Sequence, residues 1–541
     1  MPKLLKRALL LLVVAAMLAA SLCACTGDTR PSTGPSAPAQ SGELPPESAA
    51  PTQEPEGKNS VTVGIAQDLD TLDPHKAVNA GTSEVLFNLF EGLVKASPDG
   101  GVIPAVASDW VVSPDGLTYT FTLREGVTFH NGDPVTVEDV LYSLRRCNGG
   151  ENDGVPIVSS FILDSATGES LIRSIEAGEE GQVVVTLAEP RLEFPYFLTA
   201  AHIIPADSGD TIGDHPIGTG PFSFVSFTPQ ESLVVKKYDG YWGDPAHLDE
   251  VTFRIYTGAS AVNSMLMALQ AGSLDLVIHL PNTYADQVGD GTVLQSTMKL
   301  VQALYINNAV KPFDDVRVRQ AMYYAIDVPE IIDMVCDGAG VPTGTSMYPA
   351  QQRYFLPELA EVYTQDIEKA KQLLADAGYP DGFDMTITVP SNYAQHVDTG
   401  VVIADQLKAV GINAEVVPVE WEAWVSDVYR GRDFQTTVSG ISASDMTARE
   451  MLVRYASDHS KNFINFSDTE FDEVTAKAQT TLDESEQMEL YKRAEQILNE
   501  QAASLWLQDL CELVVLSPEL DPDSFTFYCT YVLDMSSVKY K

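Results

Sequence analysis

The chain has 541 residues, and its 33 Lys and Arg are outnumbered by 76 Asp and Glu, giving a formal net charge of −43 at pH 7. So acidic a protein is repelled by nucleic acid and by an anionic bilayer, and neither is expected as a partner. The charge does not identify a ligand, because a high net charge also serves simply to keep a protein soluble.

The first 25 residues have the pattern of a secretion signal. Basic residues precede an apolar run, residues 8–20, that is short for a membrane span. The Leu-Cys-Ala-Cys that follows, residues 22–25, resembles the bacterial lipobox, in which a signal peptidase cuts before a cysteine that carries diacylglycerol. We therefore expect residues 1–24 to be a lipoprotein signal peptide and Cys25 to be the lipidated residue. Plain secretion, with Cys23 and Cys25 incidental, is the alternative.

A polar segment separates this signal from the rest of the chain. Residues 25–59 are rich in Pro, Ser, Gly and Glu, and such a segment buries too little apolar surface to offset its ordering entropy. We expect a disordered tether with an end-to-end distance of about 30–35 Å. About 480 residues follow, too many for one core and suited to two or more domains.

The first third of this body alternates strands with helices, which favours an α/β domain. Residues 61–66 predict a short strand, and residues 82–94 carry apolar side chains at helical spacing. Residues 118–123 alternate polar with apolar side chains, which predicts a second strand with one buried face.

Turn and capping signals follow. Asn131-Gly132 predicts a tight turn because both residues tolerate positive φ, and Thr136 followed by Asp139 predicts a capping box at the start of a helix. In Pro-Ile-Gly-Thr-Gly-Pro-Phe, residues 216–222, the glycines permit a backbone path that larger residues would resist. Ser260 is expected to cap a helix that ends at Gly272, before the strand 274–278.

The second half of the body repeats this alternation, which again indicates α/β structure. Its last helix carries a stripe of apolar residues that core packing explains without any chemistry. The predicted elements are a helix starting at Asp315, a helix over 366–378, a strand over 385–390, a helix over 400–410, a strand over 412–419 and a helix over 486–501.

Four cysteines remain beyond the signal region. An exported location permits disulfides, and four cysteines allow three pairings. Cys511 with Cys529 is the favoured pair because both flank a short C-terminal stretch, and free thiols at all four positions, Cys147 and Cys336 included, are the alternative. No CxxC spacing suggests a metal or redox site.

Several segments together resemble one known family. The run from Gly101 to Leu144, the segment 216–222, the YDGYW of 238–242 and LYINNAVKPFDDVRVRQAMYYAID, residues 304–327, are similar to the oligopeptide, dipeptide and nickel-binding proteins of ABC importers. The resemblance extends from about residue 60 to about residue 510. It implies a large, three-subdomain, two-lobed periplasmic-binding-protein-like α/β fold with a hinge between the lobes.

The resemblance also implies how the chain divides. In this family the chain leaves the first lobe near its middle, builds the second lobe and returns near its end. We therefore expect the first lobe over 60–303, with an extra subdomain at about 94–215, the second lobe over 304–508, and a C-terminal return to the first lobe over 509–541.

The resemblance further points to a ligand-binding segment. Peptide-binding members hold an extended ligand by main-chain hydrogen bonds, and an Asp in a GWxAD-like segment neutralises its α-ammonium. The matching stretch here is residues 440–445, with Ile441 in place of the usual Trp, then Ser442, and Ser444 where the Asp is usual. Either Asp445 takes the role through a local shift, or the ligand has no free N-terminus there, or the alignment is off by one.

Other ligand-binding candidates come from loops and aromatic residues. Trp421 and Trp424 match positions of cleft-facing aromatics in the family and either stack on a ligand or seal the core. Asn392 and Tyr393 follow a predicted strand, at the strand end where open α/β sheets tend to bind ligands. The loop Gln67–Asp70 is the matching loop of the first lobe, although Asp70 can instead belong to a structural turn.

The function expected from these features is binding rather than catalysis. No GxSxG, HExxH, P-loop or GxGxxG motif occurs, and the eight histidines lack metal-ligand spacing, so no enzyme activity, cofactor or metal is expected. The resemblance implies a monomeric lipoprotein on the outer face of the bacterial cytoplasmic membrane that captures peptides and delivers them to an ABC permease and ATPase. The alternatives are another small solute (a nickel chelate or an oligosaccharide) or peptide capture without transport, as a receptor or chaperone.

Overall fold

The structure is a computed structural model that describes residues 59–77, 79–148, 170–206, 208–258, 260–442, 447–529 and 531–541. The predicted signal peptide, Cys25 and the tether up to residue 58 lie outside the described residues, and so do Ser444 and Asp445.

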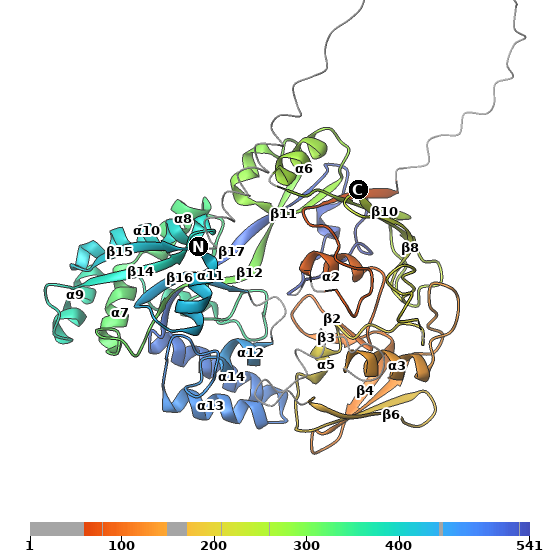
Figure 1. Cartoon of the computed structure of the whole chain (residues 1–541), viewed down its shortest axis with the longest axis horizontal. Helices are drawn as coiled ribbons and strands as arrows, with labels where there is room; N and C mark the ends of the chain where they lie inside the picture. Colours follow the sequence, from red (N-terminus) through yellow and green to blue (C-terminus); the bar gives the residue numbers. More distant parts are fainter. Residues whose placement is uncertain are drawn as a thin grey trace, which may run out of the picture. The chain divides into compact units, whose positions relative to one another are not determined.

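The described chain is an α/β protein built on one large mixed sheet (Figure 1). The sheet has 11 strands in the order β15-β14-β16-β12-β17-β11-β1-β10-β9-β8, with β13 paired to β17. β1 is parallel to β10 and β11, and β14 is parallel to β15 and β16, as strands joined through helices commonly are. The strands are β1 (Ser60–Ile65), β8 (Phe222–Thr228), β9 (Ser232–Lys237), β10 (Glu250–Ile255), β11 (Leu276–Pro281), β12 (Thr292–Ile306), β13 (Val341–Pro342), β14 (Asp384–Pro390), β15 (Asn413–Val419), β16 (Thr436–Ser442) and β17 (Ser504–Leu516).

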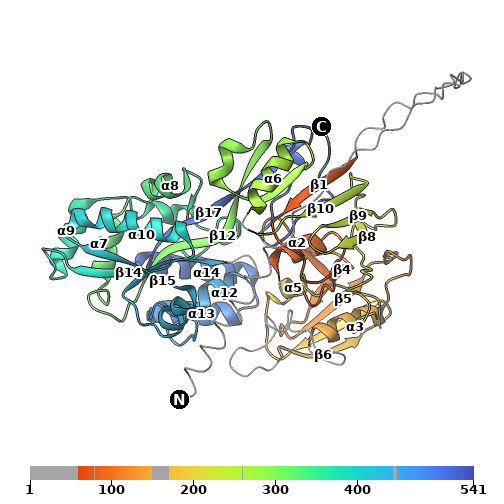
Figure 2. The same ribbon diagram turned by 45° about the horizontal axis from the view of Figure 1, so that its top comes forward.

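Two long antiparallel strands, β12 and β17, run side by side through the middle of this sheet (Figure 2). Their register shifts between Thr297 and Val301, so the ladder is interrupted there by a β-bulge. The boundaries expected between the lobes, at 303/304 and 508/509, fall inside β12 and β17. The division into lobes stays a prediction.

Two smaller sheets lie within residues 94–187. A four-stranded antiparallel sheet in the order β4-β5-β7-β6 has its own buried core, in which Tyr119 and Phe121 of β5 face inward as the alternation predicts. The capping box at Thr136 is confirmed, because Asp139 N donates to Thr136 Oγ1 and Thr136 N donates to Asp139 Oδ2. The strands are β2 (Val94–Ala96), β3 (Val102–Pro104), β4 (Ala107–Val112), β5 (Thr118–Leu123), β6 (Ile172–Ala177) and β7 (Gln182–Leu187).

Helices cover the sheets, and several of them begin at an Asp or Thr whose side chain accepts a backbone hydrogen bond. Asp315 Oδ1 accepts from Arg317 N as expected at the start of α7, whereas Ser260 occupies the N-cap position of α6 without a side-chain hydrogen bond. The helices are α2 (Ala80–Leu86), α3 (Val137–Cys147), α5 (Phe194–Phe197), α6 (Ala261–Gln270), α7 (Val316–Ala325), α8 (Val328–Cys336), α9 (Ile367–Asp376), α10 (Ala394–Leu407), α11 (Trp421–Ala423), α12 (Ala448–Val453), α13 (Thr469–Thr480) and α14 (Glu484–Glu500), with short 3₁₀ or π turns at Asn282–Gln287, Pro357–Glu361, Lys408–Val410, Trp424–Arg430 and Pro522–Ser524.

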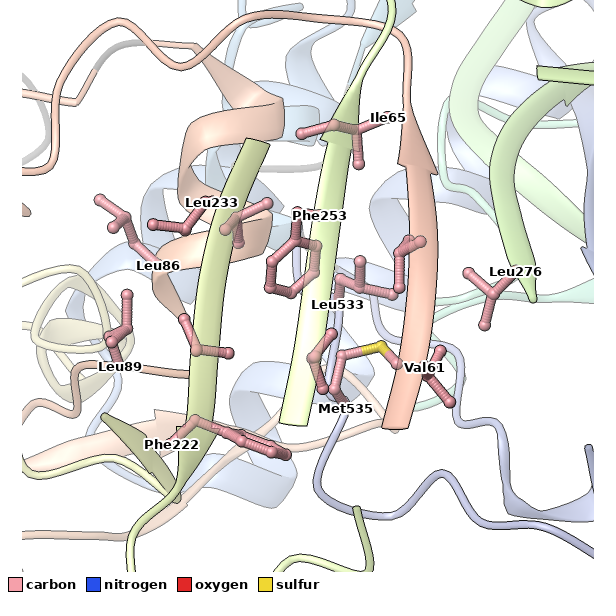
Figure 3. Packing of buried hydrophobic residues seen from close by; sticks show 14 of the residues in the cluster. Val61, Ile65, Leu86, Leu89, Phe222, Leu233, Phe253, Leu276, Leu533 and Met535 are labelled. Atoms are coloured by element: carbon pink, nitrogen blue, oxygen red, sulfur yellow. The ribbon is translucent and has the colours of Figure 1, made fainter. Parts of the chain in front are cut away.

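The core around β1 is closed by the end of the chain. Leu533 and Met535 pack among the buried residues of β1, β9 and β10, as Figure 3 shows. Asn88 fixes this segment, because its Nδ2 donates to Leu533 O at 2.8 Å and its Oδ1 accepts from Met535 N at 2.9 Å. The C-terminal residues therefore belong to the same core as the first strand.

The helix expected over 82–94 is wrong at its C-terminal end. α2 stops at Leu86, because the carbonyl oxygens of Asn88 and Leu89 accept hydrogen bonds from Phe222 N and Gly220 N instead of continuing the helix. A Cβ on Gly220 would lie 2.6 Å from Asn88 O, so this close approach is what requires the glycine.

The disulfide expected between Cys511 and Cys529 is absent, and all four described cysteines are free thiols. The two residues pack against different elements. Cys511 lies opposite Thr297 in the ladder of β12 and β17, whereas Cys529 Sγ donates to the carbonyl oxygen of Ala350 at 2.6 Å.

Candidate ligand-binding site

Three parallel strands end at one edge of the large sheet, and the candidate residues follow them. In the ladder of β14 and β15, Pro390 lies opposite Val419, so both strands end at the same level. β16 is parallel to β14 and extends past it to Ser442. Asn392 and Tyr393 thus come after β14, the two tryptophans after β15, and residues 443–445 after β16, at the strand end where open α/β sheets bind ligands.

The structure brings three of the predicted side chains together in an aromatic cluster, Tyr393, Trp421 and Trp424. The two indoles stack with centroids 5.2 Å apart and planes at 9°, and Tyr393 meets Trp421 edge to face at 5.6 Å. Such stacked and edge-to-face pairs stabilise one another beyond the area that they bury. The cluster therefore joins the loops after β14 and β15 into one surface.

The two tryptophans have different environments. Trp424 is 6% exposed, and its Nε1 donates to Thr437 Oγ1 of β16 at 2.9 Å, which satisfies its only polar group. Trp421 is 41% exposed, so one face of its indole is available to a ligand. Trp424 thus seals the core and supports Trp421, and Trp421 is the residue of the pair that can stack on a bound molecule.

The segment predicted to hold a ligand's ammonium is described only in part. Ile441 is half-buried, lies opposite Val301 of β12 and packs against the same buried cluster as Trp424. The backbone of Ser442 lies opposite Leu300. Because Ser444 and Asp445 lie outside the described residues, their roles stay predictions.

The edge of β16 near this segment is partly open. β16 pairs with β12 along its whole length, from Thr436 to Ser442. On its other side, the described ladder with β14 covers only Thr436 and Thr437. The backbone from Val438 to Ser442 therefore extends beyond the β14 ladder; Val438 and Ser439 are buried, whereas Gly440 and Ile441 are half-buried. An extended chain can pair with an edge of this kind.

The first-lobe candidates lie in the turn that leads into α2. Gln67 and Asp70 are exposed, and the Gln67 amide lies against Gly81. Asp70 Oδ2 accepts from Asn79 N at 3.3 Å, and Asp70 N lies 3.2 Å from the Thr82 hydroxyl that accepts its hydrogen bond. These bonds organise the turn itself, which agrees with a structural role for Asp70.

A buried ion pair holds the following part of this turn in place. Asp73 Oδ1 and Oδ2 lie 2.9 and 2.6 Å from the two terminal nitrogens of Arg146, and both side chains are 3% exposed. The Arg146 guanidinium lowers the pKa of Asp73 against the opposing effect of burial. The geometry is bidentate, which is the strongest form of such a pair.

The structure also contains a pocket, with a cavity volume of about 260 Å³, that no sequence pattern indicated. Its walls come from residues 100–119 and 192–196 on one side and from 351–354, 447–448 and 484–487 on the other. Sequence patterns detect neighbours along a strand or helix, and these walls are far apart in the chain. Thr447, which lines the pocket, is the first described residue after the predicted ligand segment.

Two ionisable groups sit at the crossing strands. Burial raises the pKa of Asp509 in β17 to about 7, although Leu300 N donates to its Oδ1 at 2.8 Å and favours the charged form. Next to the strand, His279 lies between two carboxylates, with Nε2 2.8 Å from Glu84 Oε1 and Nδ1 2.8 Å from Glu512 Oε1. These carboxylates raise the pKa of His279 to about 10 against the opposing effect of burial.

The sequence can be placed among known proteins. A family model described as bacterial extracellular solute-binding proteins, family 5 Middle, matches residues 101–463, more than half of the chain. The chain belongs to this family. This family 5 binding protein is 29% identical over 476 residues to heme-binding protein A from Haemophilus influenzae, covering 82% of this chain and 84% of the relative. It is 29% identical over 436 residues to the dipeptide-binding protein of Escherichia coli strain K12, covering 75% and 80%.

A solved structure gives the same fold. The periplasmic murein tripeptide binding protein MppA, in its unliganded open form, matches with a TM-score of 0.78 at 24% identity, covering 90% of this chain and 98% of that one. The family 5 binding protein therefore has the two-lobed α/β fold predicted from its sequence. Family 5 comprises extracytoplasmic substrate-binding proteins of ABC importers, which bind peptides or other small ligands and work with a permease.

Two further properties of the described residues bear on what the family 5 binding protein can do. Within the described ranges, no group of three or more His, Cys, Asp or Glu side chains is arranged to hold a metal ion. None of the helices in the described part of the chain has both the length and the apolar character needed to cross a membrane.

Proposed function

We propose that this family 5 protein is the peptide-binding lipoprotein of an ABC importer. The edge of β16 beyond the β14 ladder, at residues 440–442, carries the proposal, because an extended peptide can add to it as a further strand. Main-chain hydrogen bonds to this edge suit peptides of many sequences, and the exposed face of Trp421 covers one side chain. The dipeptide and murein tripeptide binders among its relatives support this ligand class.

Ligand capture proceeds by hinge closure at β12 and β17, a motion known from periplasmic binding proteins. These strands connect the predicted lobes, and the bulge between Thr297 and Val301 leaves their ladder interrupted in the middle. A peptide that contacts both lobes favours the closed form by its differential affinity for that form. The closed surface is what the permease recognises.

The ligand class is tested by native mass spectrometry on residues 60–541, followed by denaturation and identification of whatever is released. Co-purified peptides support the proposal. Free N-termini on these peptides favour Asp445 as the residue that neutralises the ammonium, and blocked N-termini favour a ligand without that group. A released metal complex, heme or sugar overturns the peptide assignment and leaves the transport assignment in place.

The main-chain contacts are tested by calorimetry with a captured peptide and with analogues that are N-methylated at one amide each. Methylation removes a donor, so at least one internal position is expected to lose about tenfold in affinity. Trp421→Ala is expected to weaken binding as well, and Met267→Ala, which truncates another exposed apolar side chain, is the control. Equal affinity for all methylated analogues contradicts the strand-addition mode.

Lipidation is proposed at Cys25 and is tested by labelling cells with an alkyne-bearing fatty acid. We expect Cys25→Ser to abolish labelling and release the protein into the medium, while the neighbouring Cys23→Ser leaves both unchanged. Labelling that depends on Cys23, or on neither cysteine, overturns the assignment. The mass of the native protein also tests the monomer, which is the state proposed here.

A further inference from the structure

The pocket of about 260 Å³ has a carboxylate oxygen without a partner among the described residues. Glu193, just before α5, accepts a hydrogen bond at Oε1 from the Tyr491 hydroxyl of α14 at 3.1 Å. Its other oxygen, Oε2, is buried and is the atom that lacks a partner. Burying a carboxylate oxygen without a hydrogen bond costs free energy. A ligand that donates a hydrogen bond to this oxygen removes that cost.

A second acceptor in the same pocket is also unpaired. Gln351 is 2% exposed, and its Nε2 donates to the Tyr348 hydroxyl at 3.1 Å. Its Oε1 has no partner within the described part of the chain. Both unpaired atoms belong to side chains that line the pocket, so two acceptors without donors lie at its wall.

The remaining charges leave the pocket negative. Arg353 is the cation of the described lining, and it is already paired with Glu484. Glu193 is therefore the carboxylate whose charge no cation of that lining neutralises.

Aromatic rings form much of the remaining wall. Trp110, Tyr119, Tyr196 and Tyr354 line the pocket, and the faces of such rings attract a desolvated cation. A carboxylate, an amide oxygen and aromatic rings together suit an organic ammonium or guanidinium group. An anionic group is excluded by Glu193, and a purely apolar group leaves both acceptors unpaired.

One buried cluster packs against both the pocket and the predicted peptide site. Ala448 lines the pocket and belongs to the same buried cluster as Trp424, against which Ile441 also packs. We propose that the pocket is a side-chain subsite of the peptide cleft and that it accepts the ammonium of a lysine or the guanidinium of an arginine residue. The inference rests on the proposed function, because it assumes that a peptide occupies the cleft.

The test compares peptides that differ only in one side chain. Lysine, acetyl-lysine and norleucine are introduced in turn at each position of a captured peptide. The dissociation constants of these peptides are measured by calorimetry at constant salt. We expect one position where lysine binds at least about tenfold more tightly than either analogue, because both analogues lose the charge. Equal affinity at every position overturns the subsite and leaves peptide binding intact, whereas no binding of any peptide overturns the proposed function itself.

Variants then assign the preference to the pocket. Glu193→Gln keeps the acceptor for Tyr491 and removes the charge, so it is expected to abolish the preference for lysine over acetyl-lysine. Glu189→Gln removes the same charge at an exposed position four residues earlier and is expected to retain it. Gln351→Met, which removes the amide oxygen at similar volume, is the second variant, and thermal melting checks that each variant is folded. A lysine preference that survives Glu193→Gln and Gln351→Met contradicts the assignment.

Discussion

Asp509 makes the stability of the crossing strands depend on pH. Its side chain is fully buried, and its Oδ1 accepts from Leu300 N at the bulge of β12. Burial raises its pKa from the usual 3.8 to about 7, a difference of about three units. Since each unit corresponds to 1.36 kcal/mol, the effect on the free energy of unfolding is about 4 kcal/mol at most.

The sign follows from the proton balance. Between about pH 4 and pH 7, the folded protein keeps the Asp509 proton that the unfolded chain has already lost, so stability falls as the pH rises through this window. Asp509→Asn cannot titrate. The free energy of unfolding of this variant minus that of the wild type should therefore increase by about 4 kcal/mol between pH 4 and pH 8.

The assay is urea denaturation followed by circular dichroism at half-unit steps of pH, with both proteins measured in the same buffers. Other titrating groups contribute equally to the two profiles and cancel in the difference. Parallel profiles for the wild type and Asp509→Asn refute the reasoning, because they mean that Asp509 titrates alike in the folded and unfolded states.

Three further predictions concern stability. Trp424→Ala should lower the free energy of unfolding by about 3–5 kcal/mol in urea denaturation, whereas Trp421→Ala at an exposed position should change it by less than about 1 kcal/mol. Asp73→Ala leaves Arg146 buried without its partner and should cost about 3–5 kcal/mol, and a loss below about 1 kcal/mol would contradict the buried ion pair. The raised pKa of His279 means that its stabilisation is fully present below about pH 6.5 and is lost as the pH rises towards 10. The stability advantage of the wild type over His279→Gln should shrink across that window in melting experiments, and a constant difference contradicts it.

Local features of the fold were predictable because they depend on neighbours in the chain. The strand Thr118–Leu123 follows from alternation, and the capping box follows from Thr136 and Asp139 three residues apart. The end of α2 was not predictable, because Asn88 and Leu89 pair with a segment more than 100 residues later. Helical periodicity depends only on nearby residues, so it carries no information about such a distant hydrogen-bond partner.

The candidate site also has parts that the sequence could predict and parts that it could not. The loops after β14 and β15 could be found from strand ends, and the structure adds that Tyr393, Trp421 and Trp424 touch. The difference between the two tryptophans depends on Thr437, a hydrogen-bond partner on the neighbouring strand that no spacing indicates. The pocket with Glu193 could not be found, because its unpaired acceptors become visible only when separate parts of the chain meet.

The return of the chain's end to the first core has a consequence for biosynthesis. Leu533 and Met535 fill the core around β1, and the Tyr540 hydroxyl donates to Ser60 O at 2.7 Å, so residues 480 positions apart in the chain pack together. Most domains can begin to fold from the N-terminus while the ribosome is still translating. The core around β1 therefore stays incomplete until residues 517–541 have been translated, so this core cannot close while the earlier part of the chain is being made.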